Sequence, residues 1–455
     1  MPGRNFEKIL YYSTNRKLKN GFKKNVTFRE ALFMGQAPDK GLFMPSRIPK
    51  FSKSEIKNLR GKPYSEVAYQ ILKKFLASDI SNRDLQKITR ESYNFDVPVE
   101  KFGRQAYIIQ LDKGPTASFK DFAARMTARL MQKLKPKNRK ITVLVATSGD
   151  TGSAVGEAFR GLAGIRVYIL YPRDEVSKVQ KKQLDLIGKN VQAIAVDGKF
   201  DDCQSLVKEA FSDPKLKSLN LSSANSINIS RVLPQIVYYF YAYASVAENF
   251  EPVVFSVPSG NFGNALGCEI ARRMGLPVKK LVIATNENDE FPVFLKTGIY
   301  KKICPSRACL SSAMNVGNPS NLARFFDLYS GILDSEGIVR RMPLIEDMRK
   351  NIFSVAITND ETAGTIKEVY EKYDVIIDPH CAVGIAALGK YGRNDLAVCI
   401  ETADPAKFPE LIKMILGISP KMPKSLSKIM KRNGKAHNMP NDYGKLREYL
   451  MAQKT

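Results

Sequence analysis

Lys120 is the residue with the clearest chemistry in this chain. It follows a turn at residues 114–118 and lies between Phe119 and Phe122. Apolar side chains at spacings of three and four residues predict a helix that begins just after the turn. These side chains are Phe119, Phe122, Met126, Leu130 and Leu134. Lys120 is therefore expected at the N-terminal end of a helix, among apolar neighbours.

This position favours an uncharged lysine amine. The positive end of the helix dipole and the apolar neighbours both disfavour an ammonium ion, which lowers the pKa of the amine. A neutral lysine amine attacks an aldehyde and forms a Schiff base. An ordinary lysine that covers apolar surface and extends its charge into water has the same local sequence. A second feature is needed to choose between the two interpretations.

That feature is a loop between a strand at residues 253–257 and a helix at residues 265–274. The loop reads Ser259-Gly260-Asn261-Phe262-Gly263-Asn264. Its glycines permit close approach of a ligand, and its amides form an anion nest at the helix N-terminus. It lacks the lysine of a P-loop and the spacing of a dinucleotide-binding loop. The loop predicts a bound phosphate, with a plain strand-to-helix turn as the alternative.

A similar loop, residues 147–152, follows a strand at residues 141–146. Its hydroxyl and amide groups suit a carboxylate, and a helix cap by Asp150 or Thr151 would use the same groups. Two anion nests and an activated lysine together fit pyridoxal phosphate and an amino-acid substrate. Thr402, after a strand at residues 396–400, is a candidate partner for the cofactor's ring nitrogen, although its spacing favours a helix cap.

The composition narrows the class of protein. A chain of 455 residues predicts two to four domains, and 44% hydrophobic with 25% charged residues is ordinary for a globular protein. No apolar run approaches the roughly 18 residues of a membrane span, and the first residues lack a secretion signal. Six scattered cysteines and two histidines disfavour a metal site. A cytoplasmic protein without a metal is expected, as a monomer or a homodimer.

The net charge of +26 has three interpretations. Nucleic-acid binding is disfavoured, because lysine and arginine are spread along the chain and no nucleic-acid-binding motif is present. A positive potential that attracts small anions such as phosphate esters is the second interpretation. A lysine-rich background without a partner is the third.

The order of predicted elements favours an α/β fold. Short apolar strands alternate with loops and helices from residue 106 onward, which is typical of parallel sheets covered by helices. The predicted strands are residues 141–146, 166–171, 191–196, 253–257, 281–285, 375–377 and 396–400, and a long helix is expected at residues 230–248. We expect two open, mostly parallel sheets with the active site between them, plus a mainly helical N-terminal domain.

Four domain-sized segments follow from this order. They are an N-terminal domain at residues 1–105, a smaller mobile α/β domain at 106–245, a larger α/β cofactor domain at 246–420 with an irregular insertion at 287–345, and a basic C-terminal tail at 421–455. No catalytic cluster is evident in the first of them.

Several segments jointly resemble the threonine synthase family, in the longer form of many bacteria and fungi. They are residues 114–122, 146–152, 223–231 and 260–264, supported by residues 41–45 and 402–408. The motifs follow the family's order over nearly the whole chain. The resemblance implies a fold of the tryptophan synthase β type. It also implies a pyridoxal-phosphate-dependent lyase that converts O-phospho-L-homoserine and water into L-threonine and phosphate.

The resemblance assigns roles to individual residues. Lys120 is similar to the lysine that binds the cofactor, and Thr402 to the hydroxyl facing the ring nitrogen. The cofactor-binding residues that it implies are Lys120, Asp150, Gly260, Asn261, Phe262, Gly263, Asn264 and Thr402. The substrate-binding residues that it implies are Thr147, Ser148, Thr151, Asn225, Ser226, Asn228 and Arg231. We expect Arg231 to hold the substrate phosphate.

Two positions depart from the family pattern. Asp404 stands where the family usually has histidine. Asn15 and Arg16 stand where relatives often show Arg-Gly, so Arg16 is expected to compensate. His380 keeps a histidine that the family often has, and it either lines the site or caps the helix that begins at Ala382.

Two other functions remain open at this point. A relative that eliminates phosphate and releases 2-oxobutyrate uses the same loops. A non-catalytic basic binding protein predicts no bound cofactor and a salt-sensitive affinity for nucleic acid.

Overall fold

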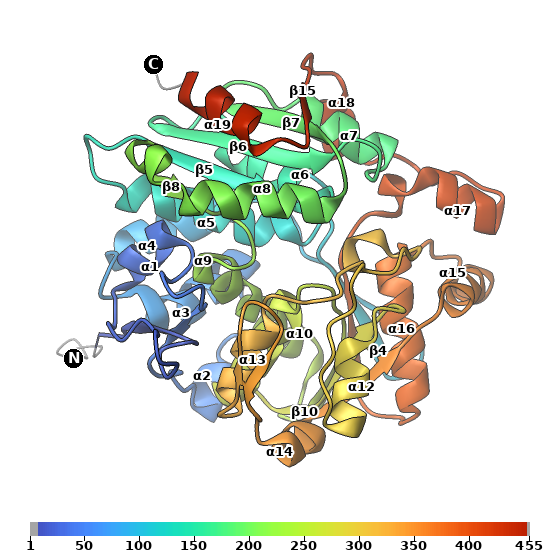
Figure 1. Cartoon of the computed structure of the whole chain (residues 1–455). Coiled ribbons are helices and arrows are strands. Elements are labelled where there is room, and N and C mark those ends of the chain that lie inside the picture. Colours follow the sequence, from blue (N-terminus) through green and yellow to red (C-terminus); the bar gives the residue numbers. More distant parts are fainter. Residues whose placement is uncertain (1–7, 453–455) are drawn as a thin grey trace.

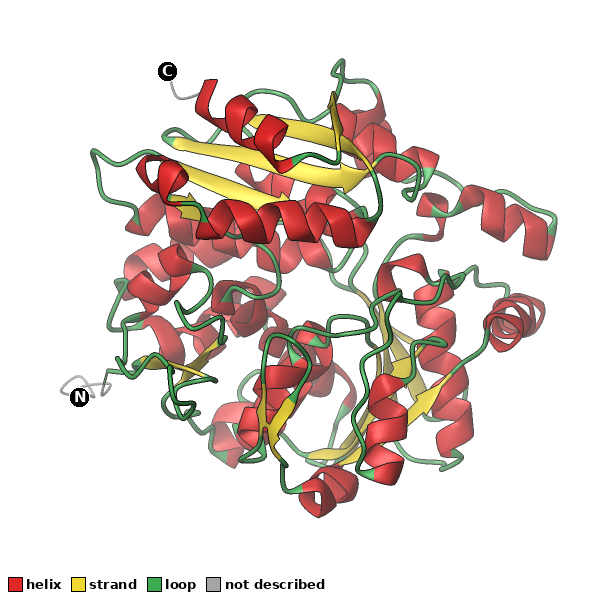
Figure 2. Ribbon diagram, in the orientation of Figure 1, coloured by secondary structure: helices red, strands yellow, loops and turns green. Residues whose placement is uncertain are grey.

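The protein is an α/β molecule built on two main parallel sheets that are covered by helices (Figure 1). The structure, a computed structural model, describes residues 8–452. Figure 2 shows the two sheets as separate groups of strands, one in the upper and one in the lower half of the molecule. No helix within residues 8–452 has the length and apolar character needed to cross a membrane.

The upper sheet has five strands in the order β15-β7-β6-β5-β8, and all neighbours are parallel. Its strands are β5 Ile141–Ala146, β6 Ile165–Pro172, β7 Val191–Asp197, β8 Leu221–Ser222 and β15 His437–Pro440. The helices around it are α5 Lys120–Leu134, α6 Asp150–Phe159, α7 Lys178–Asp185, α8 Phe200–Ser212, α18 Lys424–Met430 and α19 Tyr443–Ala452. Every residue of β5 is buried, as expected for a parallel strand covered on both faces.

The lower sheet has six strands in the order β13-β10-β9-β14-β4-β3. Its strands are β3 Val99–Lys101, β4 Ala106–Gln110, β9 Val253–Pro258, β10 Val278–Thr285, β13 Ile352–Ala356 and β14 Ala397–Glu401. Only the edge pair β3–β4 is antiparallel in this sheet. Helices packed on this sheet include α10 Ile236–Val246, α11 Gly263–Arg273, α15 Asn359–Tyr373 and α16 Pro379–Tyr391, and α17 Pro409–Leu416 packs on α15.

Smaller elements pack beside the two main sheets. The N-terminal ones are β1 Tyr11–Ser13, α1 Phe28–Met34, β2 Phe43–Pro45, α2 Lys53–Lys57, α3 Tyr64–Leu76 and α4 Asn82–Ser92. Residues 287–345 are more regular than expected, with α12 Glu290–Thr297, η3 Ser312–Met314, α13 Leu322–Leu328, β11 Ile332–Leu333 and β12 Val339–Arg341, followed by α14 Ile345–Asn351.

Sequence order and sheet membership differ at three strands. β3 lies in the segment expected to form the N-terminal domain, and β4 in the segment expected to form the smaller α/β domain, yet both join the lower sheet. β15 lies in the predicted C-terminal tail and extends the upper sheet beside β7. The alternation of strands and helices along the chain does not reveal such pairings, because each of these sheets also joins strands that are distant in sequence.

Two predicted elements were wrong. The long helix at residues 230–248 is divided into α9 Ile229–Val232, η2 Leu233–Gln235 and α10, because Pro234 cannot continue the regular hydrogen-bond ladder. Residues 375–377 form no strand, since only a short link separates the left-handed Asp374 from the helix cap Asp378. One edge of the lower sheet is β13, which was not among the predicted strands, and the other edge is β3.

Candidate active site

A cavity of about 590 Å³ lies at the loops that follow the strands of both sheets. Most of the predicted site residues line it. These are Lys120, Ser148, Asp150, Thr151, Asn225, Ser226, Arg231, Gly260, Asn261, Phe262, Gly263, Asn264 and Thr402. Thr147 and Asn228 do not line it. The structure therefore brings thirteen of the fifteen predicted residues to one cavity.

The turn before α5 presents Lys120 to the cavity. The Asp121 carboxylate accepts hydrogen bonds from the backbone N–H and the hydroxyl of Thr116, each at 2.7 Å. Ala117 has a left-handed φ of 55°, which reverses the chain between these two residues. Gly114 lies so close to Asp121 that a Cβ would be 2.5 Å from its carboxylate oxygen. These contacts explain the spacing of the turn, and Lys120 follows as the first residue of α5.

The surroundings of Lys120 favour a neutral amine. Burial lowers the pKa of Lys120, the nearby Asp150 carboxylate acts in the opposite direction, and the cations of Lys407 and Arg231 lower the pKa further. The Lys120 Nζ atom lies 3.6 Å from an Asp150 oxygen. The predicted lowering of the pKa is therefore supported, and burial is its main cause.

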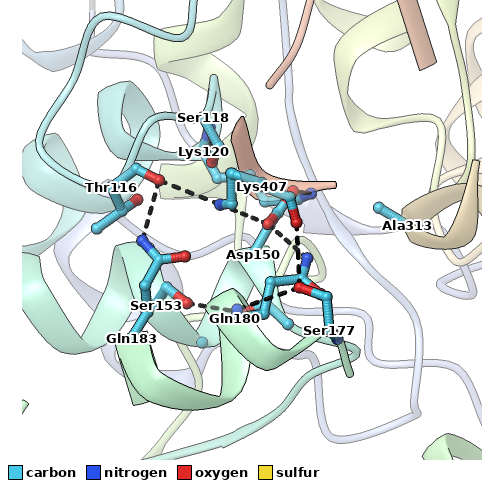
Figure 3. A network of polar contacts seen from close by, with 12 residues as sticks. Thr116, Ser118, Lys120, Asp150, Ser153, Ser177, Gln180, Gln183, Ala313 and Lys407 are labelled. Atoms are coloured by element: carbon cyan, nitrogen blue, oxygen red, sulfur yellow. Dashed lines mark hydrogen bonds and ion pairs between the residues drawn. The ribbon is translucent and has the colours of Figure 1, made fainter. Parts of the chain in front are cut away.

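Asp150 is the centre of a polar network that the sequence did not reveal (Figure 3). The Nζ atom of Lys407 lies 2.6 Å from Asp150 Oδ1, and Gln180 donates a hydrogen bond of 2.8 Å to the same oxygen. Burial raises the pKa of the Asp150 carboxyl, but the cations of Lys407 and Lys120 outweigh burial and lower it overall. Lys407 is completely buried, although it comes from a segment far along the chain from both Asp150 and Gln180.

The glycine loop forms a cup of free backbone amides. Within residues 8–452, no acceptor takes the N–H groups of residues 260–265, and the first intrahelical bond of α11 begins at Leu266. The buried Asn264 Nδ2 atom also lacks a partner. Phe262 has a left-handed φ of 60°, and its ring packs against Phe291 and Phe325. Such a cup suits a phosphate group.

In the loop after β5, Thr147 has a structural role. The Thr147 hydroxyl accepts hydrogen bonds from the N–H groups of Gly149 and Gly152, so it fixes the start of α6 and does not face the cavity. The prediction that Thr147 binds substrate is not supported, because its oxygen is engaged by the loop itself. Across residues 8–452, no acceptor takes the N–H groups of Ser148, Asp150 and Thr151.

Asn228 also has a structural role. Its amide nitrogen donates to the carbonyl oxygens of Leu32 and Ser223, and its amide oxygen accepts from the N–H and the hydroxyl of Ser230. No polar atom of Asn228 is left for a substrate, which corrects the expectation of a binding role. Asn225 differs, because its Oδ1 atom is buried without a partner at the cavity wall.

Arg231 provides a buried positive charge beside the cavity. It is 3% exposed and donates one hydrogen bond, of 2.5 Å, to the Ala224 carbonyl, while its Nε atom has no partner. In the part of the chain that the structure describes, no carboxylate forms an ion pair with it. Burial lowers the pKa of Arg231 to about 10, so it remains a cation at neutral pH. An unpaired buried cation is suited to an anionic ligand.

Asp404, which stands where the family usually has histidine, and His380 both have defined contacts. Asp404 accepts a hydrogen bond of 2.8 Å from the Ala406 N–H and caps the turn that carries Lys407, but it does not line the cavity. His380 lines the cavity, and its Nε2 atom accepts the Ala313 N–H at 3.1 Å. The other ring nitrogen, Nδ1, then carries the proton and donates to Asp378, which caps α16.

The N-terminal segment contributes to the cavity, contrary to the sequence-based expectation. Thr14 and Asn15 line it, and the buried Asn15 Oδ1 atom has no partner. Arg16 does not compensate for the substitution at position 15, because its guanidinium group stacks on the Tyr12 ring at 3.6 Å and does not line the cavity. The only sequence feature that could have predicted this contribution to the cavity is the short family pattern at residues 13–16.

A buried lysine with a lowered pKa and a phosphate cup in one cavity are typical of pyridoxal-phosphate-dependent enzymes. The residues fit this cofactor, because the free amides of residues 260–265 match its phosphate and Lys120 matches its aldehyde. The family model described as "Pyridoxal-phosphate dependent enzyme" matches residues 94–402. The predicted cofactor is thus confirmed.

Two further family models match the ends of the chain. The model "Threonine synthase N terminus" matches residues 10–93, and "Threonine synthase, C-terminal" matches residues 381–450. The threonine synthase of Serratia marcescens is 37% identical, with 94% of this chain and 96% of that protein covered. The solved structure of pyridoxal-phosphate-bound threonine synthase from Brucella melitensis has a TM-score of 0.90 at 35% identity, with 98% of this chain and 99% of that one covered. The yeast threonine synthase structure has a TM-score of 0.88 at 32% identity, with 99% of both chains covered. This chain belongs to the threonine synthase family.

Proposed function

We propose that this protein converts O-phospho-L-homoserine and water into L-threonine and phosphate with pyridoxal phosphate as its cofactor. The main support for the proposal is that one cavity brings together Lys120, the free amides of residues 260–265 and Arg231, which has no carboxylate partner among the described residues. The cofactor and the substrate each bring a phosphate group. The cup and Arg231 offer two separate anion sites for them.

Lys120 is the single base that we assign to the reaction. When bound, the cofactor withdraws electrons from the substrate's α-carbon, which makes nearby protons acidic. Lys120 removes the α-proton and then a β-proton, so that the C–O bond at the γ-carbon breaks and phosphate leaves. The γ-carbon then takes up a proton and becomes the methyl group of threonine. Water adds its oxygen to the β-carbon, and Lys120 returns a proton to the α-carbon. Each step requires an amine that loses and regains a proton easily, which agrees with its buried position.

The other cavity residues bind and orient the substrate. Arg231 holds the substrate phosphate through its unpaired guanidinium edge. The free amides of Ser148, Asp150 and Thr151 at the start of α6 receive the substrate carboxylate. Thr402 would offer its hydroxyl to the cofactor's ring nitrogen, and the Thr402 carbonyl is already fixed by the N–H of Phe119 at 2.9 Å. A neutral hydroxyl at that nitrogen suits elimination and replacement chemistry.

The active site belongs between the two sheet-bearing units in this proposal. The unit around the upper sheet moves towards the unit around the lower sheet when substrate binds, and this motion excludes bulk water. The helical N-terminal segment closes one side of the cavity through Thr14 and Asn15. O-phospho-L-homoserine is the expected substrate, and nucleic acid is not an expected partner.

Product analysis tests the proposal directly. Purified protein with pyridoxal phosphate is incubated with O-phospho-L-homoserine, and phosphate, threonine and 2-oxobutyrate are measured together. Threonine and phosphate in equal amounts are expected. Phosphate with an equal amount of 2-oxobutyrate would instead establish the phospho-lyase alternative. Absence of phosphate release would reject both reactions.

A further inference from the structure

Lys407 is a buried charged residue to which the proposed reaction assigns no task. Its side chain has no exposed surface, and its Nζ atom donates a hydrogen bond of 3.1 Å to the Thr116 carbonyl. The same atom lies 2.6 Å from Asp150 Oδ1, while Asp150 Oδ2 lies 3.6 Å from the Lys120 Nζ atom. Figure 3 shows Asp150 close to both lysines. One carboxylate therefore bridges two lysine side chains, and its contact with Lys407 is the shorter.

The charge of Asp150 creates a difficulty for a lysine base. A buried carboxylate beside a lysine strongly favours the ammonium form of that lysine. If Lys120 were the only partner of Asp150, the pair would hold the proton that Lys120 must release. A second lysine side chain on the other oxygen offsets this effect, because it compensates the carboxylate whichever state Lys120 is in.

We propose that Lys407 is a positioning residue that fixes and neutralises Asp150, so that Asp150 orients Lys120 without holding it as an ammonium ion. The inference rests on the proposed role of Lys120 and adds a residue to that role. Lys407 contacts Asp150 and the Thr116 carbonyl, its charge also acts on Lys120 from a distance, and it does not line the cavity.

The other charges around Lys120 agree with this division of roles. Asp150 from α6, Lys407 from η4 (Pro405–Lys407) and Arg231 from α9 are the ionisable groups that act on Lys120. Asp121 faces Lys407 from α5, and burial raises the pKa of its carboxyl to about 6. Asp150 keeps its negative charge across the neutral range, because Lys407 and Lys120 lower its pKa against the effect of burial.

Four variants separate this role from ordinary structural support. Lys407→Met removes the cation, and Lys407→Gln does so with a polar side chain in case the first variant does not fold. Lys407→Arg keeps the charge. Asp150→Asn removes the carboxylate, and it should shift the pH midpoint of neutral Lys120 in the opposite direction. A matched control, Lys74→Met, accompanies them, because Lys74 is a mostly buried lysine that is paired with Glu55 at 2.7 Å, away from the cavity.

Two readouts report on Lys120 independently. In the full chain freed of cofactor, the rate of Lys120 acetylation by acetic anhydride is measured against pH by mass spectrometry, which gives the pH midpoint of its neutral form. In the cofactor-loaded protein, kcat/KM for O-phospho-L-homoserine is measured against pH. We expect Lys407→Met and Lys407→Gln to raise both midpoints by about one pH unit or more. Asp150→Asn should lower the acetylation midpoint, and Lys407→Arg and Lys74→Met should leave both near the parent values.

The outcomes decide between the two roles. A loss of activity at every pH with an unchanged acetylation midpoint in folded Lys407→Met or Lys407→Gln would overturn the inference, since that is the pattern of structural support. An equal shift in Lys74→Met would overturn it as well. Because acetylation needs no turnover, a shifted midpoint in a protein that makes no threonine rejects the proposed function alone. Threonine production without any shift rejects only the role of Lys407.

Discussion

Gly260 illustrates how one residue without a side chain shapes the phosphate cup. A Cβ atom at this position would lie 2.9 Å from the Met314 Cα atom and 3.0 Å from the Ala313 carbonyl oxygen. The segment at residues 313–314 cannot easily yield, because the Ala313 N–H is bonded to His380. We expect Gly260→Ala to weaken cofactor binding about tenfold or more, as measured by fluorescence titration.

The control for this change is another glycine. Gly364 lies in α15, and a Cβ atom added there would have no other atom within 4 Å, so Gly364→Ala should leave cofactor affinity unchanged. An equal loss in both variants, or no loss in Gly260→Ala, would contradict the account of the cup.

Arg231 should contribute to substrate binding at a cost in stability. Because its buried cation lacks a carboxylate partner in the described chain, Arg231→Gln removes a charge that is unfavourable in the free protein. We expect KM for O-phospho-L-homoserine to rise about tenfold or more, and the melting temperature of the substrate-free protein to stay equal or rise. Steady-state kinetics and thermal unfolding check the two effects, with Arg231→Lys expected to be intermediate in KM. An unchanged KM would place the substrate phosphate elsewhere.

Single residues could be predicted from the sequence where their chemistry depends on residues that are near them in sequence. Lys120 and the loop at residues 260–264 were found because a turn, a helix start and two glycines mark them locally. Lys407 was not singled out, and Asn15 was noted only as a departure from the family pattern, because their burial depends on contacts with segments far away in sequence. Asn228 was assigned to the substrate from its motif, and only its hydrogen bonds show that it is fully occupied.

At the scale of elements, α12 begins with an unusual buried acid. The Glu290 side chain is 3% exposed and its Oε2 atom has no hydrogen-bond partner. Burial raises the pKa of Glu290 to about 8. The folded protein therefore binds this proton more tightly than the unfolded chain, so the stability from the neutral carboxyl is fully present below the ordinary pKa of 4.5 and is lost as the pH rises from there to about 8.

Replacing Glu290 by glutamine should remove this dependence. At pH 9, Glu290→Gln is expected to raise the free energy of unfolding by about 2–4 kcal/mol over the parent, with a smaller difference at pH 5. Urea unfolding at several pH values measures the effect. Glu346→Gln, at an exposed glutamate of α14, serves as the control and should change little. Equal slopes against pH in the parent and Glu290→Gln would contradict the assigned pKa.

Elements were predictable where apolar spacing and helix caps agree. The strands before both anion-binding loops and the helix that starts at Lys120 are present as expected. The interruption near Pro234 shows the opposite case, since a continuous aromatic and aliphatic run concealed a change in helix geometry. Residues 287–345 looked irregular because their short helices are separated by prolines and turns, and packing rather than local propensity holds them.

At the scale of the whole molecule, the cavity is walled by two units that face each other. Lys208 and Phe211 of α8 line it from the upper unit, and Lys302 and Glu336 line it from the lower unit. The alternation of strands and helices predicted two such units. It did not predict that β4 belongs to the lower sheet or that β15 completes the upper one, because strand neighbours are set by long-range packing.

This arrangement predicts closure on substrate. Small-angle X-ray scattering of the cofactor-loaded protein should give a smaller radius of gyration after addition of O-phospho-L-homoserine, because the upper unit moves onto the lower one. Inorganic sulfate at the same ionic strength is the control and should leave the radius nearly unchanged. An identical radius with and without substrate would contradict a mobile unit.

The most direct test of the whole account is reductive trapping of the cofactor on the protein. The holoenzyme is treated with borohydride and digested, and the modified peptide is identified by mass spectrometry, with Lys120→Ala treated in parallel. One pyridoxyl-phosphate group is expected on Lys120, and none in Lys120→Ala. Modification of a different lysine, or no stable modification, would contradict the claim that Lys120 and the cup at residues 260–265 form one catalytic site.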